Sequence, residues 1–168
     1  VIERSRERSV FELDYAYPAD PASGVASGAA PIVETKRISI RLGEPFFRVE
    51  ARFTRSGQPV ADLAIAIGVT THDGKARATL RPANRWIACW ESMAGSEVGT
   101  AAMADPKRID EIKEVKSDKK DASHLFIRMK TDRNGSIDYQ AGYGWKKAGE
   151  ITTSKDWKNY LDEKEALF

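Results

Sequence analysis

Residues 36–55, "KRISIRLGEPFFRVEARFTR", contain two runs in which apolar and charged or polar side chains alternate, separated by the Gly43–Pro45 segment. An alternation with a period of two residues is typical of a β-strand that packs one face on a core and leaves the other in water. This pattern is common in antiparallel sheets. The stretch therefore predicts two neighbouring antiparallel strands, with the apolar sets Ile38, Ile40, Leu42 and Phe47, Val49, Ala51, Phe53.

The same alternation recurs on both sides of this stretch. It appears in "SVFELDYAY" from Ser9, and the segments "KARATLR", "RWIACWE", "SHLFIRMK" and "SIDYQAGYGW" predict further strands. In "ADLAIAIGVTT", from Ala61, large apolar residues alternate with alanines, which predicts a strand covered on both faces. Asp-Gly and Asn-Gly pairs at 72–75 and 133–136 are typical of tight hairpin turns. Residues 17–31 are rich in Ala, Gly, Ser and Pro, and we expect a long exposed loop there.

A single helix is predicted near the end of the chain. Thr153 can cap it, Asp156 completes a box-like start, and Trp157, Tyr160 and Leu161 share one face. Many short strands and one terminal helix predict an all-β fold, an antiparallel β-sandwich with a C-terminal helix. The 168 residues fit one domain spanning residues 1–168.

Composition excludes several classes of protein. The formal net charge is only +2 and no basic stripe is present, so we expect no nucleic-acid partner. No run approaches the length of a membrane helix, which argues against membrane insertion. The single cysteine, Cys89, lies between apolar neighbours and is expected to be a buried structural thiol. No metal-ligand spacing, phosphate loop or dinucleotide fingerprint is present, so neither metal nor cofactor is expected. The chain starts at Val1, without an initiator Met, and we expect an N-terminal portion to be missing.

Two histidines are candidates for chemistry. His72, in "VTTHDGK", follows an apolar strand, and Asp73 could orient it as a general base; alternatively, both residues simply form an exposed turn. His124 begins a strand after a charged loop and is the weaker candidate.

Aromatic residues supply two further candidates. Trp90 could stack on a sugar ring while Glu91 acts on a glycosidic bond, or Trp90 could simply anchor the core. In "YQAGYGW", from Tyr139, a tyrosine could donate a proton or form a platform, and Trp145 ends the strand. Gly142 and Gly144 lie on the opposite face, where they permit a close approach by a ligand or by the terminal helix.

The segments "IACWESMAGSEVGTAAMADPKRI" and "YQAGYGWKKAGEITTSKDWKNYL", in this order, resemble a bacterial family called domain of unknown function 4861. The resemblance extends over most of the chain from about Glu34. It implies an exported protein, periplasmic or secreted, of polysaccharide-degrading bacteria. It also implies a β-sandwich related to the galactose-mutarotase-like supersandwich, and an oligosaccharide or polysaccharide partner that contains uronic acids, as in pectin.

Two functions are compatible with these expectations. A lyase would use His72 or Tyr139 as the base, with Arg81 or Arg85 neutralising the sugar carboxylate, whereas a hydrolase would depend on Glu91. The alternative is a non-catalytic glycan-binding module that uses its aromatic residues, among them Trp90 and Trp145. We expect His72, Trp90, Glu91 and Tyr139 to converge on one concave sheet face. The sequence does not indicate an oligomeric state.

Overall fold

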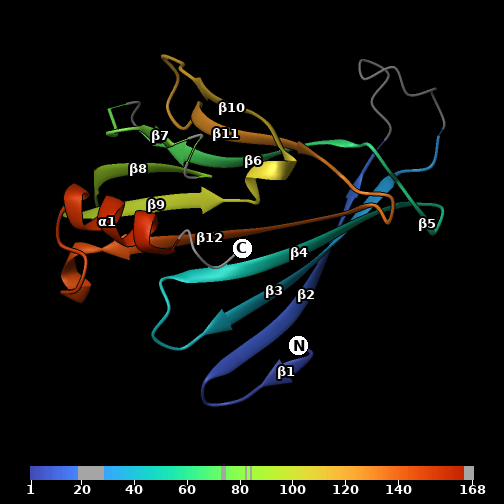
Figure 1. The fold of residues 1–168 in the computed structure, drawn as a ribbon, viewed down its shortest axis with the longest axis horizontal. Helices are drawn as coiled ribbons and strands as arrows, with labels where there is room; N and C mark the ends of the chain where they lie inside the picture. Colours follow the sequence, from blue (N-terminus) through green and yellow to red (C-terminus); the bar gives the residue numbers. More distant parts are fainter. Residues whose placement is uncertain (19–28, 73–74, 82, 84, 165–168) are drawn as a thin grey trace. The chain divides into compact units, whose positions relative to one another are not determined.

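A computed structural model describes residues 1–18, 29–72, 75–81, 83 and 85–164 (Figure 1). The fold is all-β and mostly antiparallel, with one α-helix near the C-terminal end of the described residues, as the sequence predicts. Contacts divide the chain into two compact units, Val1–Ala64 with Lys130–Asp138, and Ile65–Met129 with Tyr139–Phe168. The middle of the predicted loop at 17–31 and the predicted turn residue Asp73 lie outside the described residues.

The first unit is built on an antiparallel meander. Strands β2 and β3 pair along their whole length, from Arg8↔Arg41 to Tyr17↔Ile32, and β3 pairs with β4 in the same manner. Its strands are β1 (Glu3–Arg4), β2 (Arg8–Tyr17), β3 (Ile32–Arg41), β4 (Phe46–Arg55) and the short β5 (Gln58–Pro59).

The predicted alternation is confirmed from Val49 to Phe53 in β4, but Phe47 is only half-buried, and the predicted core residues Ile40 and Leu42 in and after β3 are exposed. Val49, Ala51 and Phe53 are buried, while the charged residues between them are exposed. The predicted Asn-Gly turn also forms, because the Asp132 carboxylate accepts the backbone N–H groups of Asn134 and Ser136.

The second unit contains two antiparallel sheets. One has the order β12-β9-β8-β7 and the other β10-β11-β6, and Figure 1 shows the second sheet lying over β7–β9. Strand β12 begins in the first unit and enters the second at Tyr139. The strands are β6 (Ala64–Thr71), β7 (Thr79–Arg81), β8 (Trp86–Met93), β9 (Ser96–Met103), β10 (Ile109–Val115), β11 (Ser123–Lys130) and β12 (Ser136–Trp145).

One prediction for β6 is wrong. Its large apolar residues Ile67 and Val69 are buried, but Ala64, Ala66 and Gly68 on the other face are exposed. The strand therefore packs one face on the core, as ordinary antiparallel strands do. Small residues alone did not indicate a second covering layer.

The terminal helix α1 (Ser154–Lys164) has the predicted cap and the predicted docking face. Thr153 Oγ1 accepts the Asp156 backbone N–H at 3.1 Å, and Asp156 Oδ2 accepts the Thr153 N–H at 2.9 Å, which is a reciprocal capping box. Trp157 and Leu161 are buried, and Tyr160 stacks on Trp157. The 3-10 turns Pro106–Arg108 and Lys146–Ala148 complete the described helices.

Glycines on the central strands allow this helix to approach the sheet. A Cβ atom on Gly99 would lie 2.5 Å from the Trp157 indole, and one on Gly144 would lie 2.9 Å from Ile151. Gly99 and Gly144 are paired directly across β9 and β12. The prediction that the glycine face of β12 receives the terminal helix is therefore confirmed.

Candidate active site

The two faces of β8 have different surroundings. Trp86, Ala88 and Trp90 share the face that meets α1, since Trp90 is paired with Gly99 and Trp86 Nε1 donates a hydrogen bond to Asp162 of the helix. Strand alternation places Ile87, Cys89 and Glu91 on the opposite face. That face is the one that meets β6.

His72 and Glu91 form a close pair between the two sheets of the second unit. His72 follows the last residue of β6, and its Nδ1 lies 2.7 Å from Glu91 Oε1. The His72 backbone N–H also donates to Glu91 Oε2, at 3.2 Å. One carboxylate thus holds both the imidazole ring and the backbone of the same residue, which fixes the position of the ring.

The two partners differ strongly in exposure. The Glu91 side chain is 4% exposed, while the His72 side chain is 47% exposed. A carboxylate can only accept, so this contact suits the tautomer of a neutral imidazole that has its proton on Nδ1 and its lone pair on Nε2. A buried carboxylate that orients a solvent-facing imidazole is the arrangement by which enzymes prepare a general base. The candidate His72 is thus oriented by Glu91.

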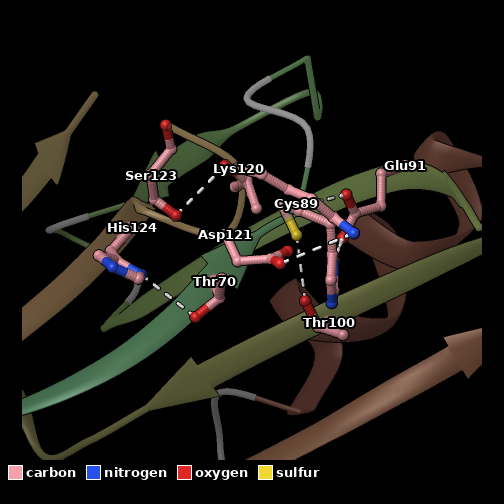
Figure 2. Close-up of polar contacts among 10 residues, drawn as sticks. Thr70, Cys89, Glu91, Thr100, Lys120, Asp121, Ser123 and His124 are labelled. Atoms are coloured by element: carbon pink, nitrogen blue, oxygen red, sulfur yellow. Dashed lines mark hydrogen bonds and ion pairs between the residues drawn. The ribbon is translucent and has the colours of Figure 1, made fainter. Parts of the chain in front are cut away.

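A turn from the three-stranded sheet secures the other side of His72. The Asp121 backbone N–H donates to the His72 carbonyl at 3.0 Å, and Lys120 forms a loose ion pair with Asp121 at 4.0 Å. Figure 2 shows the ion pair between Lys120 and Asp121. The Lys120 side chain is 84% exposed, so its ammonium group is accessible to a ligand.

Cys89 lies two residues before Glu91 on the same face. Its Sγ is 3.0 Å from Thr100 Oγ1 (Figure 2). Burial raises the pKa of the Cys89 thiol; the Thr100 hydrogen bond lowers it by less than that, and the Glu91 charge adds a further small rise. The thiol is therefore buried and protonated, as expected of a structural cysteine rather than a nucleophile.

Two exposed aromatic side chains lie on the same sheet face as Glu91. The pairing Glu91↔Val98↔Trp145 runs straight across β8, β9 and β12, and Cys89↔Thr100↔Tyr143 forms the next row. Directly paired residues share a face, so Trp145 and Tyr143 belong to the face of Glu91. They are 45% and 59% exposed. Sequence reasoning singled out Trp145 but missed Tyr143 as a site residue, although the alternation in "YGW" places them together.

Tyr139 shares this face but does not meet His72. Trp145 is level with Glu91, and Tyr139 lies six residues back along β12, about 20 Å at the rise of a strand. Tyr139 is half-buried at that position. The expected convergence of Tyr139 with His72 is therefore wrong.

Trp90 is also separated from the pair. It is 4% exposed on the helix side of β8, and its Nε1 donates to Glu97 Oε1 at 3.3 Å. Lys146 Nζ holds the second oxygen of Glu97 at 2.7 Å. These hydrogen bonds lower the pKa of Glu97. Trp90 therefore anchors the core, and the expectation that it shares a site with Glu91 is wrong.

The two candidate arginines lie far from Glu91. Arg81 is paired with Trp86, and its guanidinium lies 6.0 Å from that indole ring. Arg85 lies in the turn before β8, where its φ is 67°. Trp86, the partner of Arg81, is five residues before Glu91 on β8, and Arg85 is six residues before it, so both arginines lie about 17–20 Å from Glu91 along the strand direction. The expected role of Arg81 or Arg85 beside His72 is not compatible with these positions.

His124 lies on the outer face of the three-stranded sheet. Its Nδ1 is 3.1 Å from Thr70 Oγ1 (Figure 2), and its ring is tilted against Phe126. Alternation in β11 places it opposite the buried residues Leu125 and Ile127. His124 therefore belongs to a different surface from His72.

In the part of the chain that the structure describes, no group of three or more His, Cys, Asp or Glu side chains is arranged to hold a metal ion. No helix in those residues is long and apolar enough to span a membrane.

Similarity to known proteins covers most of the chain. The model of a family described as a domain of unknown function, DUF4861, matches residues 2–167. A similar curated protein, "Uncharacterized protein P7" of Formosa agariphila, is 34% identical over 134 residues. That match covers 79% of this chain and 32% of the relative, so the chain corresponds to about a third of the relative's length. No solved structure matches the chain.

Proposed function

The chain belongs to the DUF4861 family, and we propose that it carries the site of a carbohydrate-active enzyme, a lyase acting on uronic-acid-containing oligosaccharides. The observation that supports this proposal is the 2.7 Å contact that orients the exposed His72 imidazole on the buried Glu91 carboxylate. Export to the periplasm or the medium is part of the same proposal, on the resemblance noted in the sequence.

In the proposed reaction, His72 Nε2 removes the proton from the carbon next to the sugar carboxylate. The electrons of that C–H bond form a carbon–carbon double bond. The bond from the adjacent ring carbon to the glycosidic oxygen breaks, and this oxygen leaves with its electron pair and takes a proton from water. Glu91 stabilises the imidazolium that forms.

The sugar carboxylate needs a cation beside it for this proton to become acidic. Lys120 fits this role better than Arg81 or Arg85, because the next residue, Asp121, is hydrogen-bonded to the His72 carbonyl. Its ion pair with Asp121 is long and exposed, and such pairs cost little to exchange for a ligand.

A hydrolase fits this geometry less well. A glycoside hydrolase uses two carboxyl groups that flank the scissile bond. Glu91 is almost fully buried, and both of its oxygens are already engaged by His72. Its geometry supports a role in positioning His72 rather than in contacting the sugar.

The test is lyase activity of the full-length protein, followed by the ultraviolet absorbance of the unsaturated uronide. His72→Gln should lower the rate about 100-fold or more, the usual range for loss of a general base. Glu91→Gln should also lower the rate and should change its pH profile. His124→Gln is the matched control, because His124 also has its Nδ1 held by one side chain. Full activity of His72→Gln would contradict the proposal.

The exposed aromatic pair favours a second candidate, a non-catalytic glycan-binding module. Tyr143 and Trp145 can offer flat surfaces to a sugar without any chemistry at His72. In that case no unsaturated product forms with any acidic glycan. Calorimetric binding would then survive in His72→Gln and be lost in Trp145→Ala.

A further inference from the structure

Trp145 and Tyr143 lie too far from His72 to contact the sugar that reacts there. Two strand spacings separate Glu91 from Trp145, about 10 Å between their backbones. The intervening residue is Val98, which is small, apolar and 7% exposed. Val98 itself is covered, so a ligand that contacts both His72 and Trp145 must span this distance and extend beyond a single sugar unit.

The ammonium group of Lys147 lies over the ring of Trp145. Lys147 Nζ lies 5.7 Å from the centre of the Trp145 ring. The neighbouring Lys146 is paired with Glu97, but no carboxylate among the described residues forms an ion pair with Lys147. An aromatic platform with an unpaired ammonium group beside it suits a ring that carries a negative charge.

From these placements we infer that Tyr143, Trp145 and Lys147 form a distal subsite for a second, negatively charged sugar unit of the substrate. This inference rests on the proposed function, because it takes His72 as the reacting end. The enzyme then recognises oligosaccharides by their length, and it binds a chain of acidic sugars better than a monosaccharide.

The experiment measures calorimetric binding of a length series of oligouronides to the full-length protein in the His72→Gln background, where turnover is blocked. Trp145→Ala should weaken binding of the longer oligomers about tenfold, as truncation of an anchoring aromatic does, and leave the monosaccharide unchanged. Tyr143→Ala should show the same dependence on length. Trp145→Phe should restore most of the affinity, which separates stacking from misfolding.

Two further variants test the role of the Lys147 charge and the location of the subsite. Lys147→Gln should weaken binding of the acidic oligomers but not of their methyl esters. Tyr15→Ala is the matched control, because Tyr15 is 43% exposed and has Lys36 at 5.0 Å from its ring, but belongs to the first unit. Tyr15→Ala should bind every length as well as its parent.

The outcomes separate this inference from the proposed function. Equal binding of every length by Trp145→Ala and its parent would overturn the subsite, even if His72→Gln abolishes turnover. An equal loss at every length, or no binding of any oligouronide, would overturn it too. Full turnover by the His72→Gln protein with no other change would instead contradict the role of His72 as the base. A length-dependent loss of binding affinity in Trp145→Ala would still support the subsite.

Discussion

Replacing Gly99 with alanine should destabilise the second unit through a single added methyl group. The new Cβ would lie 2.5 Å from Trp157 Cδ1 and 2.7 Å from Nε1, closer than carbon atoms approach without repulsion. The Trp157 side chain is 1% exposed, so the ring has no free space into which it can move. Overpacking of this kind costs about 1–3 kcal/mol.

Gly68→Ala is the matched comparison, because Gly68 also lies in a strand and faces an aromatic ring. Its Cβ would lie 2.9 Å from the far edge of Phe126, which is only half-buried and can turn aside. We expect a change of about 0.5 kcal/mol or less there, as for surface substitutions. Gly99→Ala combined with Trp157→Leu should cost less than the sum of the two single changes, because they share one contact.

The assay is urea denaturation followed by tryptophan fluorescence, with the free energy of unfolding compared between variants. The reasoning is refuted if Gly99→Ala is as stable as the unaltered protein. It is also refuted if Gly68→Ala and Gly99→Ala lose the same stability.

Other expectations concern the helix cap and the buried thiol. Thr153→Ala should lower stability by about 1 kcal/mol, the usual loss for an N-cap, measured by the same denaturation. Hydrogen bonds from Thr153 and Thr152 lower the pKa of Asp156 in the folded protein. The ionised carboxylate therefore stabilises the fold above its unfolded pKa, and this stabilisation is lost as the pH falls through the lower folded pKa. Asp156→Asn should reduce this acid-dependent loss of stability. Cys89 should react with a thiol reagent only after unfolding, because burial raises its pKa; rapid reaction in the native protein would contradict its placement.

Local patterns were sufficient to predict where the strands and the helix lie, although not which faces of β3 and β6 are covered. The buried and exposed positions of β4 follow from a period of two residues, and the Thr153–Asp156 box follows from a spacing of three. Both signals lie within one element, and they do not depend on how distant segments meet.

The contact between His72 and Glu91 could not be predicted in the same way. It joins the end of β6 to β8, strands of different sheets, and its partner was expected to be Asp73 instead. Which strands face each other across a core depends on packing that no single segment encodes. Sequence alone therefore identified both residues as candidates but not their pairing.

The error over Trp90 has a simpler cause. Trp90 and Glu91 are adjacent in a strand, and successive side chains in a strand point to opposite faces. Alternation alone was enough to separate them. It also places Trp145 and Tyr143 together, whereas the distance to Tyr139 required the register of β12 against β9.

The paired glycines under α1 also determine the order in which this unit can be completed as it is synthesised. The face of β8 and β9 that carries Trp86 and Gly99 is contacted by Trp157 and Asp162, and these two residues leave the ribosome after every strand of the unit. Until then Gly99 and its partner Gly144 lack the side chains that pack on them. Synthesis therefore completes this face late, when the indole ring of Trp157 reaches the paired glycines.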